Sequence, residues 1–451
     1  MNQQRTKTPT FILLGFLLLF ATASYANAQK NQPGRKKTQF ILEKMANRIV
    51  RSTTYRFVDP KTGKTYSSVK GLHKITGIKA ESQYNDWHYT NGVLNIGMEE
   101  LGKVLHNKTY RDYSTKNFDF IFNHGALPYF HEYYNQQLKK GWSAIRKVNW
   151  YMFFRMVRLD DYGTMGASLI DVYHSHPESV YKSYIDQVAL HLLHGEPRLS
   201  DETISRYWPH ENTIWADDLY MSVAFLARMG KLTGDHRYYD DAIRQIIRFD
   251  HYLWCPEKQI YYHCYYTDTH QNGVAHWARA NGWIFMAQAD LLEVLPINYP
   301  GRDKVLAIFQ KQAAGIALYQ SPEGLWHQLL DKNDSYTETS ASAMFVFGLA
   351  RGVNQGWLDQ DYSSVADSGW QGILSKIDDQ GDIKDICVGT GIMPSLSFYY
   401  HRPTATNIPM GEGPVLRAGA EILQMKKYHE LPASTKYNRI FKEFTQNTKE
   451  K

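Results

Sequence analysis

Residues 213–242 read TIWADDLYMSVAFLARMGKLTGDHRYYDDA, and this stretch joins two different helical patterns across a Gly-Asp turn. The first pattern, LYMSVAFLARMGKLTGD, is apolar on nearly every side, as expected for a helix that protein covers all around. The second continues as RYYDDAIRQIIRFDHYLW and has one apolar and one polar face. The stretch therefore predicts a helical hairpin whose first helix is internal and whose second helix faces solvent.

The same hairpin pattern recurs along the chain at intervals of roughly 55–75 residues, which is a repeat period. Internal helices are predicted at 92–105, 163–174, 219–235, 281–296, 340–359 and 413–423, and their partners at 110–124, 179–195, 237–254, 303–320, 362–377 and 38–52. About six hairpins predict an all-α fold, an (α/α)6 barrel with an inner and an outer ring. An open solenoid is the alternative, but the sequence has no polar terminal caps, which favours closure.

Length and composition fit one large barrel better than several domains. The 451 residues exceed the usual domain size, yet the hairpins account for residues 29–451 as a single (α/α)6-barrel domain. The net charge of +6 is spread thinly and forms no basic stripe, so no nucleic-acid partner is expected. Aromatic residues reach 14%, which fits either a large aromatic core or a site that binds sugar rings.

Residues 1–28 have the pattern of an export signal. Arg5 and Lys7 precede an apolar run at 11–20, and the Ala26–Ala28 tripeptide forms an A-x-A cleavage site. We expect cleavage after Ala28, export to the periplasm, and no stable membrane association afterwards. An uncleaved membrane anchor is the alternative, but the apolar run is short for a membrane span.

The three cysteines, Cys255, Cys264 and Cys387, do not suggest a disulfide framework. Cys255 and Cys264 could pair across a hairpin, although buried free thiols are favoured. The sequence contains no H-E-x-x-H motif, no Cys/His spacing typical of zinc sites, and no glycine-rich phosphate loop. Neither a metal nor a cofactor is therefore expected.

Inner helices of such a barrel all begin at one rim, so polar residues at their starts should converge there. These starts read DWHYTNG, RLDDYGTMG, IWADDLYM, HWARANGW, DSYTETSAS and MGEGP. Together they predict a pocket of acids, tryptophans, one arginine and small polar residues at the mouth of the barrel.

Two pairs of adjacent acids, Asp160–Asp161 and Asp217–Asp218, occupy equivalent positions in successive hairpins. Neighbouring helical residues point about 100° apart, so only one acid of each pair can face the cavity. Two carboxylates facing each other in a partly apolar site raise one pKa and keep a proton available for general acid catalysis. The helix N-terminus opposes this effect because it favours the anion. The alternative is that all four residues only cap their helices.

Further polar and aromatic residues cluster at the same predicted rim. Arg279 lies between Trp277 and Trp283, where it could bind a carboxylate ligand; an internal ion pair with one of the aspartates is the alternative. Trp215 precedes the second acid pair. His263 ends a predicted hairpin, CPEKQIYYH, from which it could donate a hydrogen bond to a sugar hydroxyl.

The chain resembles glycoside hydrolase family 105, the unsaturated rhamnogalacturonyl hydrolases. The matching blocks follow one another over most of the chain and read WHYTNGVLNIGM, RLDDYGTMGASL, TIWADDLYMSVAFLARMGKLTGD, ARANGWIFMAQADLLEVLP, GLWHQLLDKNDSYTETSASAMFVFGLARGVNQGWLD and YYHRPTATNIPMGEGPVLRAGAEIL. The resemblance implies an (α/α)6 barrel. It also implies an oligosaccharide substrate with a 4,5-unsaturated uronic acid at its non-reducing end, the group that polysaccharide lyases leave.

The resemblance further implies a reaction and a set of site residues. In this family an aspartic acid protonates C4, water adds at C5, and the resulting hemiketal opens and releases the rest of the substrate. The motif match implies Asp217 as this acid and base, assisted by Asp160 or Asp161, with the D-x-G spacing favouring Asp161. The residues implied to bind the sugar are Tyr89, His210, Trp215, His263, Arg279 and Trp283.

Three alternatives remain open at this point. One is an unsaturated glucuronyl hydrolase acting on glycosaminoglycan or ulvan fragments, the second is a polysaccharide lyase, and the third is a non-catalytic sugar-binding barrel. The segment 51–79 is longer than the N-terminal entry segment usual in the family. It could reshape the rim, so the sugar beyond the unsaturated uronate stays undetermined.

Overall fold

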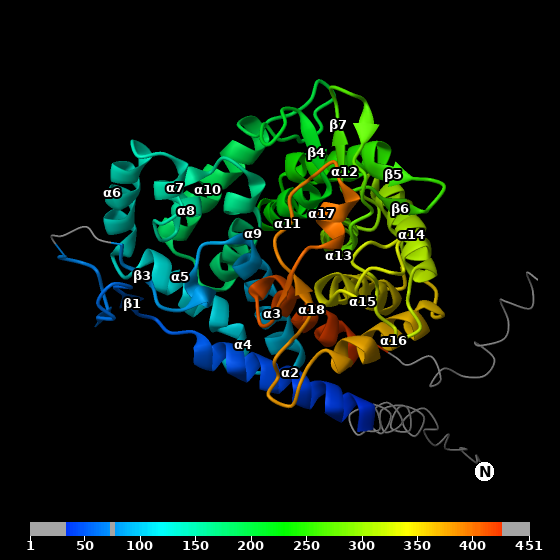
Figure 1. Ribbon diagram of the computed structural model, residues 1–451, viewed down its shortest axis with the longest axis horizontal. Helices are drawn as coiled ribbons and strands as arrows, with labels where there is room; N and C mark the ends of the chain where they lie inside the picture. The colour runs from blue at the N-terminus through cyan, green and yellow to red at the C-terminus, as the bar shows by residue number, and fades with distance from the viewer. Residues whose placement is uncertain (1–32, 73–76, 426–451) are drawn as a thin grey trace, which may run out of the picture.

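Six helices form a closed inner ring in the computed structural model, which describes residues 33–72 and 77–425 (Figure 1). In ring order they are α3 (Tyr89–Val104), α9 (Leu159–Ser175), α11 (Ala216–Thr233), α13 (Ala278–Val294), α15 (Thr339–Asn354) and α18 (Pro409–Gln424). Each packs on the next, and α18 packs on α3, so the ring closes. The predicted barrel is confirmed and the solenoid is excluded. The predicted signal at 1–28 lies outside the described residues.

Outer helices cover the ring from outside, and all except the N-terminal one pack on the inner helix that precedes them in the chain (Figure 1). They are α2 (Pro33–Ser52), α5 (Tyr113–Phe122), α10 (Ser179–His194), α12 (His236–Leu253), α14 (Arg302–Leu318) and α16 (Tyr362–Ser375). The N-terminal helix α2 packs on α18, as the hairpin pattern predicts.

The inner helices are buried because their residues are apolar or small on all faces. In α13 every residue from Ala278 to Leu292 is buried. Glycine lets neighbouring backbones approach closely: a Cβ atom on Gly92 of α3 would lie 2.5 Å from the backbone carbon of Thr164 on α9. A Cβ atom on Gly163 of α9 would collide with the backbone of Met221 on α11. These glycines therefore allow α3, α9 and α11 to pack closely side by side.

Three helices that the hairpin pattern does not predict lie between α5 and α9. They are α6 (Ala126–Leu138), α7 (Trp142–Ile145) and α8 (Tyr151–Arg155), and they form a lobe at the left of Figure 1. Strands β1 (Phe57–Val58), β2 (Thr65–Tyr66) and β3 (Lys79–Ala80) form a small sheet from the long entry segment. Phe57 stacks on Phe120 of α5 at 4.7 Å and meets Trp150 edge to face, so the sheet packs on both α5 and this lobe.

The remaining elements are short and lie in the loops between inner and outer helices. They are η1 (Gln83–Asn85), α4 (Lys108–Arg111), α17 (Leu396–Tyr400), β4 (Thr213–Trp215), β5 (Trp254–Cys255), β6 (Ile260–Tyr261), β7 (Cys264–Tyr266), β8 (Gln271–Asn272), β9 (Ile386–Cys387) and β10 (Thr404–Ala405). Strand β5 pairs with β6 in the predicted hairpin, and β4 pairs with β7.

The three cysteines are buried free thiols, which confirms the favoured prediction over a Cys255–Cys264 disulfide. Among the described helices, none combines the length and the hydropathy needed to cross a membrane.

Candidate active site

Asp217 lies in the first turn of α11, and its carboxylate contacts a buried histidine. Strand pairing brings the two together: Trp215 is opposite Cys264, and the backbone N–H of Ala216 donates to the carbonyl of His263 at 3.0 Å. Nε2 of His263 then lies 3.0 Å from Oδ2 of Asp217. The Asp217 side chain is 16% exposed, whereas the histidine ring is buried completely. One carboxylate oxygen is thus held while the group keeps access to solvent.

A tyrosine from a distant part of the chain completes this contact. The hydroxyl of Tyr399 in α17 lies 2.9 Å from Nδ1 of His263 and accepts the backbone N–H of Met393 at 3.4 Å. Its own hydrogen is therefore free to be donated to Nδ1. In the neutral ring the other nitrogen, Nε2, then carries the hydrogen and donates it to Asp217.

Asp218, the neighbour of Asp217, points to a different partner. Its two oxygens accept hydrogen bonds from Arg206 at 2.7 Å and 2.5 Å, and the side chain is buried. The guanidinium of Arg206 also lies 4.2 Å from the centre of the Trp215 ring. The adjacent acids divide as the sequence predicts: Asp218 is fixed inside the protein, while Asp217 remains accessible.

The other acid pair divides in the same way, but not as the D-x-G spacing suggests. The carboxylate of Asp161 is completely buried, where Arg155 and the backbone N–H groups of Val157 and Arg158 all donate to it. Asp161 therefore caps α9. Asp160 is 17% exposed, lies 3.3 Å from Arg206 and lines the cavity described below. The geometry thus places Asp160, not Asp161, in the open part of the site.

Charge and burial set the pKa values of the two acids that share Arg206. Burial alone would raise the pKa of Asp160, but the charges of Arg206 and Arg158 together hold it below its usual value. Burial raises the pKa of Asp218 to about 7 against the opposing charge of Arg206, and Asp160 adds to the increase. Arg206 and Arg158 thus favour the ionised form of Asp160, whereas buried Asp218 binds a proton more readily than an isolated carboxyl group does.

Arg279 is buried and serves an internal purpose. It donates to the carbonyls of Cys387 and Val388 at 2.5 Å and 2.7 Å. Its nearest carboxylate among the described residues is Glu338 at 4.0 Å, so the alternative of an ion pair with an aspartate of the acid pairs is wrong. Its guanidinium also lies 4.5 Å from the centre of the Trp277 ring. The arginine therefore fixes the 387–388 segment over the rim.

The predicted aromatic residues differ in how far they are exposed at the rim. Tyr89, the first residue of α3, lines the cavity and meets Trp283 edge to face at 6.4 Å. Trp283 is buried and stacks on Tyr220 at 5.0 Å. Trp215 is nearly buried beneath Arg206. His210 lies in the exposed loop before β4, where its ring meets Tyr266 at 5.6 Å.

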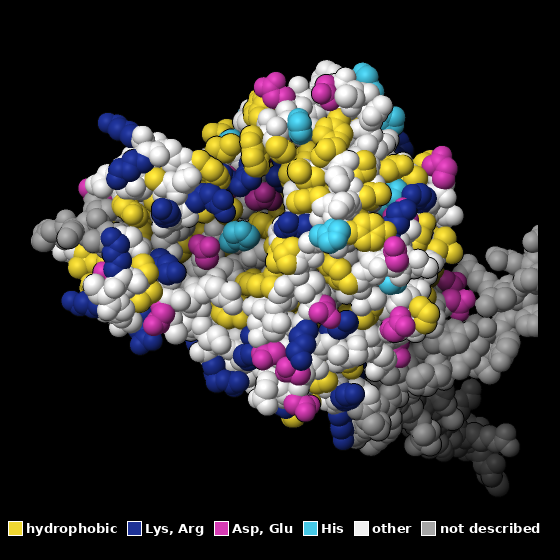
Figure 2. Space-filling view, viewed as in Figure 1, with side chains coloured by type: hydrophobic (Ala, Val, Ile, Leu, Met, Phe, Trp, Pro, Cys, Tyr) yellow, Lys and Arg dark blue, Asp and Glu magenta, His cyan; other side chains and the backbone are white. Residues whose placement is uncertain are grey.

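A cavity of about 920 Å³ opens at this rim, next to the acids. Its inner end includes Tyr89, Asp160 and Arg206, and the pKa values of Tyr89 and Arg206 both respond to the charge of Asp217. Figure 2 shows this face hollowed, with acidic and basic side chains inside the hollow and hydrophobic side chains along its edge. Asp160 therefore lies at the inner end of a large open cavity, whereas Asp217 is not among the residues that line it.

Two contributions to this site escaped the sequence reasoning. Arg206 lies in an irregular loop, and only its distance of 12 residues from Asp218 could have drawn attention to it. Tyr399 is 136 residues from His263 in the chain, and the YYH run that contains it belongs to no motif or repeat that would have indicated the contact. In the described part of the chain, no group of three or more His, Cys, Asp or Glu side chains is placed to hold a metal ion.

Comparison with known proteins assigns a family to this arrangement. Residues 67–426 match the family model described as Glycosyl Hydrolase Family 88. The chain belongs to this family. It is therefore a glycoside hydrolase, which agrees with the resemblance to the unsaturated rhamnogalacturonyl hydrolases.

Two relatives of this family 88 member carry more specific names. An unsaturated rhamnogalacturonyl hydrolase of Bacillus subtilis is 27% identical over 271 residues, which cover 58% of this chain and 77% of that protein. An unsaturated 3S-rhamnoglycuronyl hydrolase of Alteromonas sp. is 33% identical over 175 residues, which cover 38% of this chain and 42% of that protein.

Solved structures share the fold of this family 88 chain. A possible family 105 member from Salmonella enterica has a TM-score of 0.69 and 24% identity, covering 87% of this chain and 96% of that one. An unsaturated glucuronyl hydrolase from Bacillus sp. has a TM-score of 0.57 and 14% identity, covering 85% of this chain and 96% of that one. These two likenesses show the fold alone.

Proposed function

We propose that this glycoside hydrolase removes a 4,5-unsaturated uronic acid from the non-reducing end of oligosaccharides that polysaccharide lyases release, with rhamnogalacturonan fragments as the preferred class. The observation that carries the proposal is the division of the Asp217–Asp218 pair. Arg206 holds one carboxylate inside the protein, while the other stands at the mouth of the barrel beside a fixed histidine.

This arrangement suits protonation of a carbon–carbon double bond. His263 occupies Oδ2 of Asp217, so Oδ1 is the oxygen from which a proton can pass to C4 of the unsaturated ring. The electron pair of the C4=C5 bond forms the new C–H bond, and the positive charge that develops at C5 is shared with the ring oxygen. The same carboxylate, now ionised, can accept a proton from the water that attacks C5.

Addition of water at C5 produces a hemiketal, since C5 then carries both a hydroxyl group and the ring oxygen. The ring opens to a ketone at C5, which turns C1 into a hemiacetal, and the hemiacetal releases the sugar attached there. Asp160 lies near Arg206 at the inner end of the cavity, and its ionised form would stabilise the positive charge at C5. Tyr89 offers an aromatic face and a hydroxyl group to the same ring.

The names of the two relatives support a choice for the sugar that is attached to the unsaturated uronate. One is an unsaturated rhamnogalacturonyl hydrolase and the other an unsaturated 3S-rhamnoglycuronyl hydrolase. We therefore place a rhamnose unit next to the unsaturated uronate as the first substrate to test.

Export to the periplasm is part of the proposal and rests on the pattern of residues 1–28. Fractionation of cells that produce the full chain tests it, because cytoplasmic protein that retains residues 1–28 would contradict export.

The test of function is an ultraviolet absorbance assay, since the conjugated double bond of the unsaturated uronate absorbs and its hydrated product does not. The panel holds unsaturated disaccharides that end in rhamnose, hexosamine or another uronate. Absorbance should fall with the rhamnose-linked substrate. A fall only with the hexosamine-linked substrate favours a glycosaminoglycan enzyme. A rise with intact polysaccharide identifies a lyase, and binding without any change identifies a sugar-binding barrel.

A further inference from the structure

The cavity extends well beyond the acids, over the inserted lobe. Its outer wall includes Trp142 of α7, Tyr151 of α8 and the loop residues Tyr207 and Trp208. A volume of about 920 Å³ lies near the upper end of the roughly 300–1,000 Å³ that is typical of small-molecule sites. The cavity therefore has room for more than the ring that reacts with Asp217.

Large aromatic side chains stand exposed along this outer part. Trp142 is 45% exposed, Tyr207 63% and Trp208 66%. Aromatic rings of this size are usually buried, so several of them exposed around one opening mark a binding surface. Flat rings with a polar edge suit the apolar face of a sugar. The outer cavity thus has the surface chemistry of a carbohydrate site.

The same wall carries arginines whose charges are compensated to different degrees. Arg155 is paired with Asp161, and Arg206 with Asp160 and Asp218. Arg146 and Arg158 also line the cavity, but neither forms an ion pair with a carboxylate in the described ranges 33–72 and 77–425.

The environments of these two arginines differ. Nε of Arg158 is buried and lacks a hydrogen-bond partner within the part of the chain that the structure describes. Arg158 also directly precedes α9, so its charge acts on Asp160. Arg146 is exposed and lies over the edge of the cavity at 6.0 Å from the Trp142 ring.

We propose that the outer cavity binds the sugars beyond the unsaturated uronate and selects substrates with a second oxyanion, a sulfate ester or a carboxylate, on those sugars. Arg158 and Arg146 recognise the oxyanion, and Trp142, Tyr207 and Trp208 hold the rings that carry it. The inference rests on the proposed function, because it places the reacting uronate at the inner end beside Asp217.

Guanidinium groups recognise such oxyanions by geometry as well as charge. An arginine presents paired N–H donors that match two oxygens of a sulfate or carboxylate. An arginine whose buried donor has no partner gains more from an anion than one that is already paired, since the unpaired donor has been removed from water without compensation. Arg158 should therefore contribute more than Arg146.

The experiment compares three unsaturated substrates: a disaccharide with a neutral second sugar, the same disaccharide with a sulfate ester on that sugar, and a tetrasaccharide with a second uronate carboxylate. For the wild-type chain we expect kcat/KM at least about tenfold higher for one of the charged substrates, which corresponds to about 1.4 kcal/mol. Whichever charged substrate is preferred identifies the source of the oxyanion.

Variants then assign the preference to the two arginines. Arg146→Gln should raise KM for the charged substrate about threefold, with kcat and the neutral substrate nearly unchanged. Arg158→Gln should raise this KM about tenfold, and it should also lower kcat for every substrate, because the charge of Arg158 acts on Asp160. Arg237→Gln, which changes an exposed arginine paired with Asp235 on an outer helix, is the matched control and should change nothing. Arg146 is exposed, so its variant tests the proposal even if Arg158→Gln folds poorly.

The outcomes separate this inference from the proposed function. If the neutral disaccharide is hydrolysed as well as both charged substrates and both arginine variants keep the wild-type KM, the oxyanion site is wrong while the hydrolase function stands. If none of the unsaturated substrates loses absorbance, the proposed function itself is wrong.

Discussion

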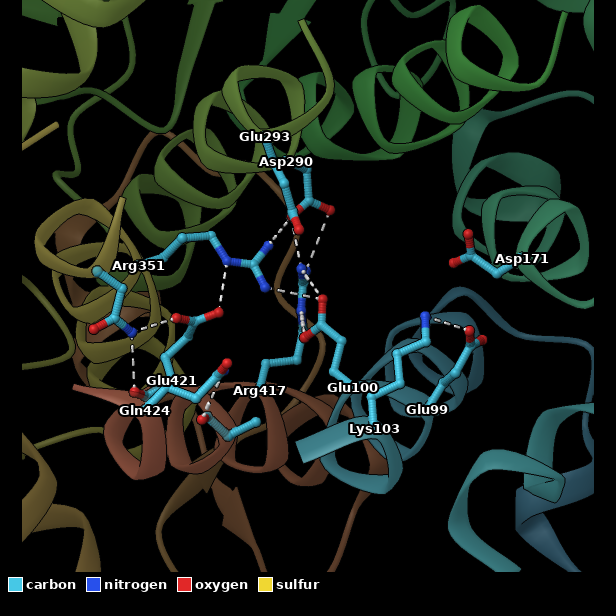
Figure 3. A network of polar contacts seen from close by, with 12 residues as sticks. Glu99, Glu100, Lys103, Asp171, Asp290, Glu293, Arg351, Arg417, Glu421 and Gln424 are labelled. Atoms are coloured by element: carbon cyan, nitrogen blue, oxygen red, sulfur yellow. Dashed lines mark hydrogen bonds and ion pairs between the residues drawn. The ribbon is translucent and has the colours of Figure 1, made fainter. Parts of the chain in front are cut away.

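The mouth and the base of the barrel both carry buried charges, but those charges are compensated differently. At the base, where the inner helices end, Arg417 donates to Glu100 at 2.9 Å and to Asp290 at 2.6 Å. Arg351 donates to Glu421 at 2.8 Å and also reaches Glu100. Figure 3 shows these side chains pointing at one another from several inner helices. Each of these three acids thus has an arginine.

The charge of Arg158 acts on Asp160 at the mouth, and Asp160, Asp217 and Asp218 all lie close to Arg206. Two of them form ion pairs with it, and the contact found for Asp217 is with His263. The base therefore resembles a structural ion-pair network, whereas Asp217 at the mouth forms no ion pair with an arginine of the described residues and stays partly exposed. We infer that ion pairing with an arginine, more than burial, distinguishes the acids that stabilise this barrel from the acid proposed to react.

The largest expected effect comes from neutralising the open acid at the mouth. Asp217→Asn should lower kcat on the unsaturated disaccharide by about 10³-fold or more, because the proton donor to C4 is lost. Unfolding in urea should change by less than about 1 kcal/mol, since the side chain is partly exposed. Asp303→Asn, also in the first turn of a helix, is the control and should leave both quantities unchanged. Activity near the wild-type level in Asp217→Asn would remove this residue from the mechanism.

Breaking the base should have the opposite signature. Arg417→Met leaves the buried Asp290 and the partly buried Glu100 without their main partner, which destabilises a protein by about 3–5 kcal/mol. The midpoint of urea unfolding should fall accordingly, while kcat per folded molecule stays close to wild type. Arg237→Met on the surface serves as the control. A large loss of kcat with unchanged stability would show that base and mouth are not separate.

The base network also predicts a pH dependence. Burial alone would raise the pKa of Glu100, but Arg417 and Arg351 lower it to about 2 from 4.5. Between these values the unfolded chain binds the proton and the folded chain does not, so stability decreases as the pH falls from about 5 to 2. The shift corresponds to about 3 kcal/mol.

Unfolding free energies of wild type and Glu100→Gln, measured from pH 6 to pH 3, isolate this contribution. Burial raises the pKa of Glu99 and of Glu293 nearby, so these acids act in the opposite direction, and the difference between the two proteins cancels them. Equal slopes for both proteins would contradict the assignment to Glu100.

The two acids at the start of α9 offer a matched pair at the mouth itself. Asp160→Asn should lower kcat about 10²-fold with little effect on stability. Asp161→Asn should lower stability by about 2 kcal/mol, because it removes a helix cap and the partner of Arg155, with kcat per folded molecule retained. The reverse pattern would restore the preference that the D-x-G spacing suggests. Steady-state kinetics measures the effect on kcat, and the midpoint of urea unfolding without substrate measures the effect on stability.

The ring of helices could be predicted from the sequence because its hairpins repeat and the apolar inner helices differ from the amphipathic outer ones. The acids at the mouth followed from their place at the helix starts. The residues alone left open which acid of each pair faces the cavity, and only the family resemblance favoured Asp217. The choice depends on contacts with Arg206 and Arg155, residues in segments without a repeat. The lobe of α6 to α8 was missed for the same reason, and with it the outer wall of the cavity.

The smallest effect tests how the open acid is held. Tyr399→Phe removes the hydroxyl that contacts Nδ1 of His263, so the tautomer that donates to Asp217 loses its support. We expect kcat to fall about tenfold with KM nearly unchanged, since the reacting group is misdirected while the sugar still binds. Tyr261→Phe removes another buried hydroxyl, which donates to Asp250 at 2.7 Å, and should lower stability similarly without affecting kcat. If both variants lose the same fraction of activity, Tyr399 only stabilises the fold, and the mouth would need no support beyond His263 to keep Asp217 in place.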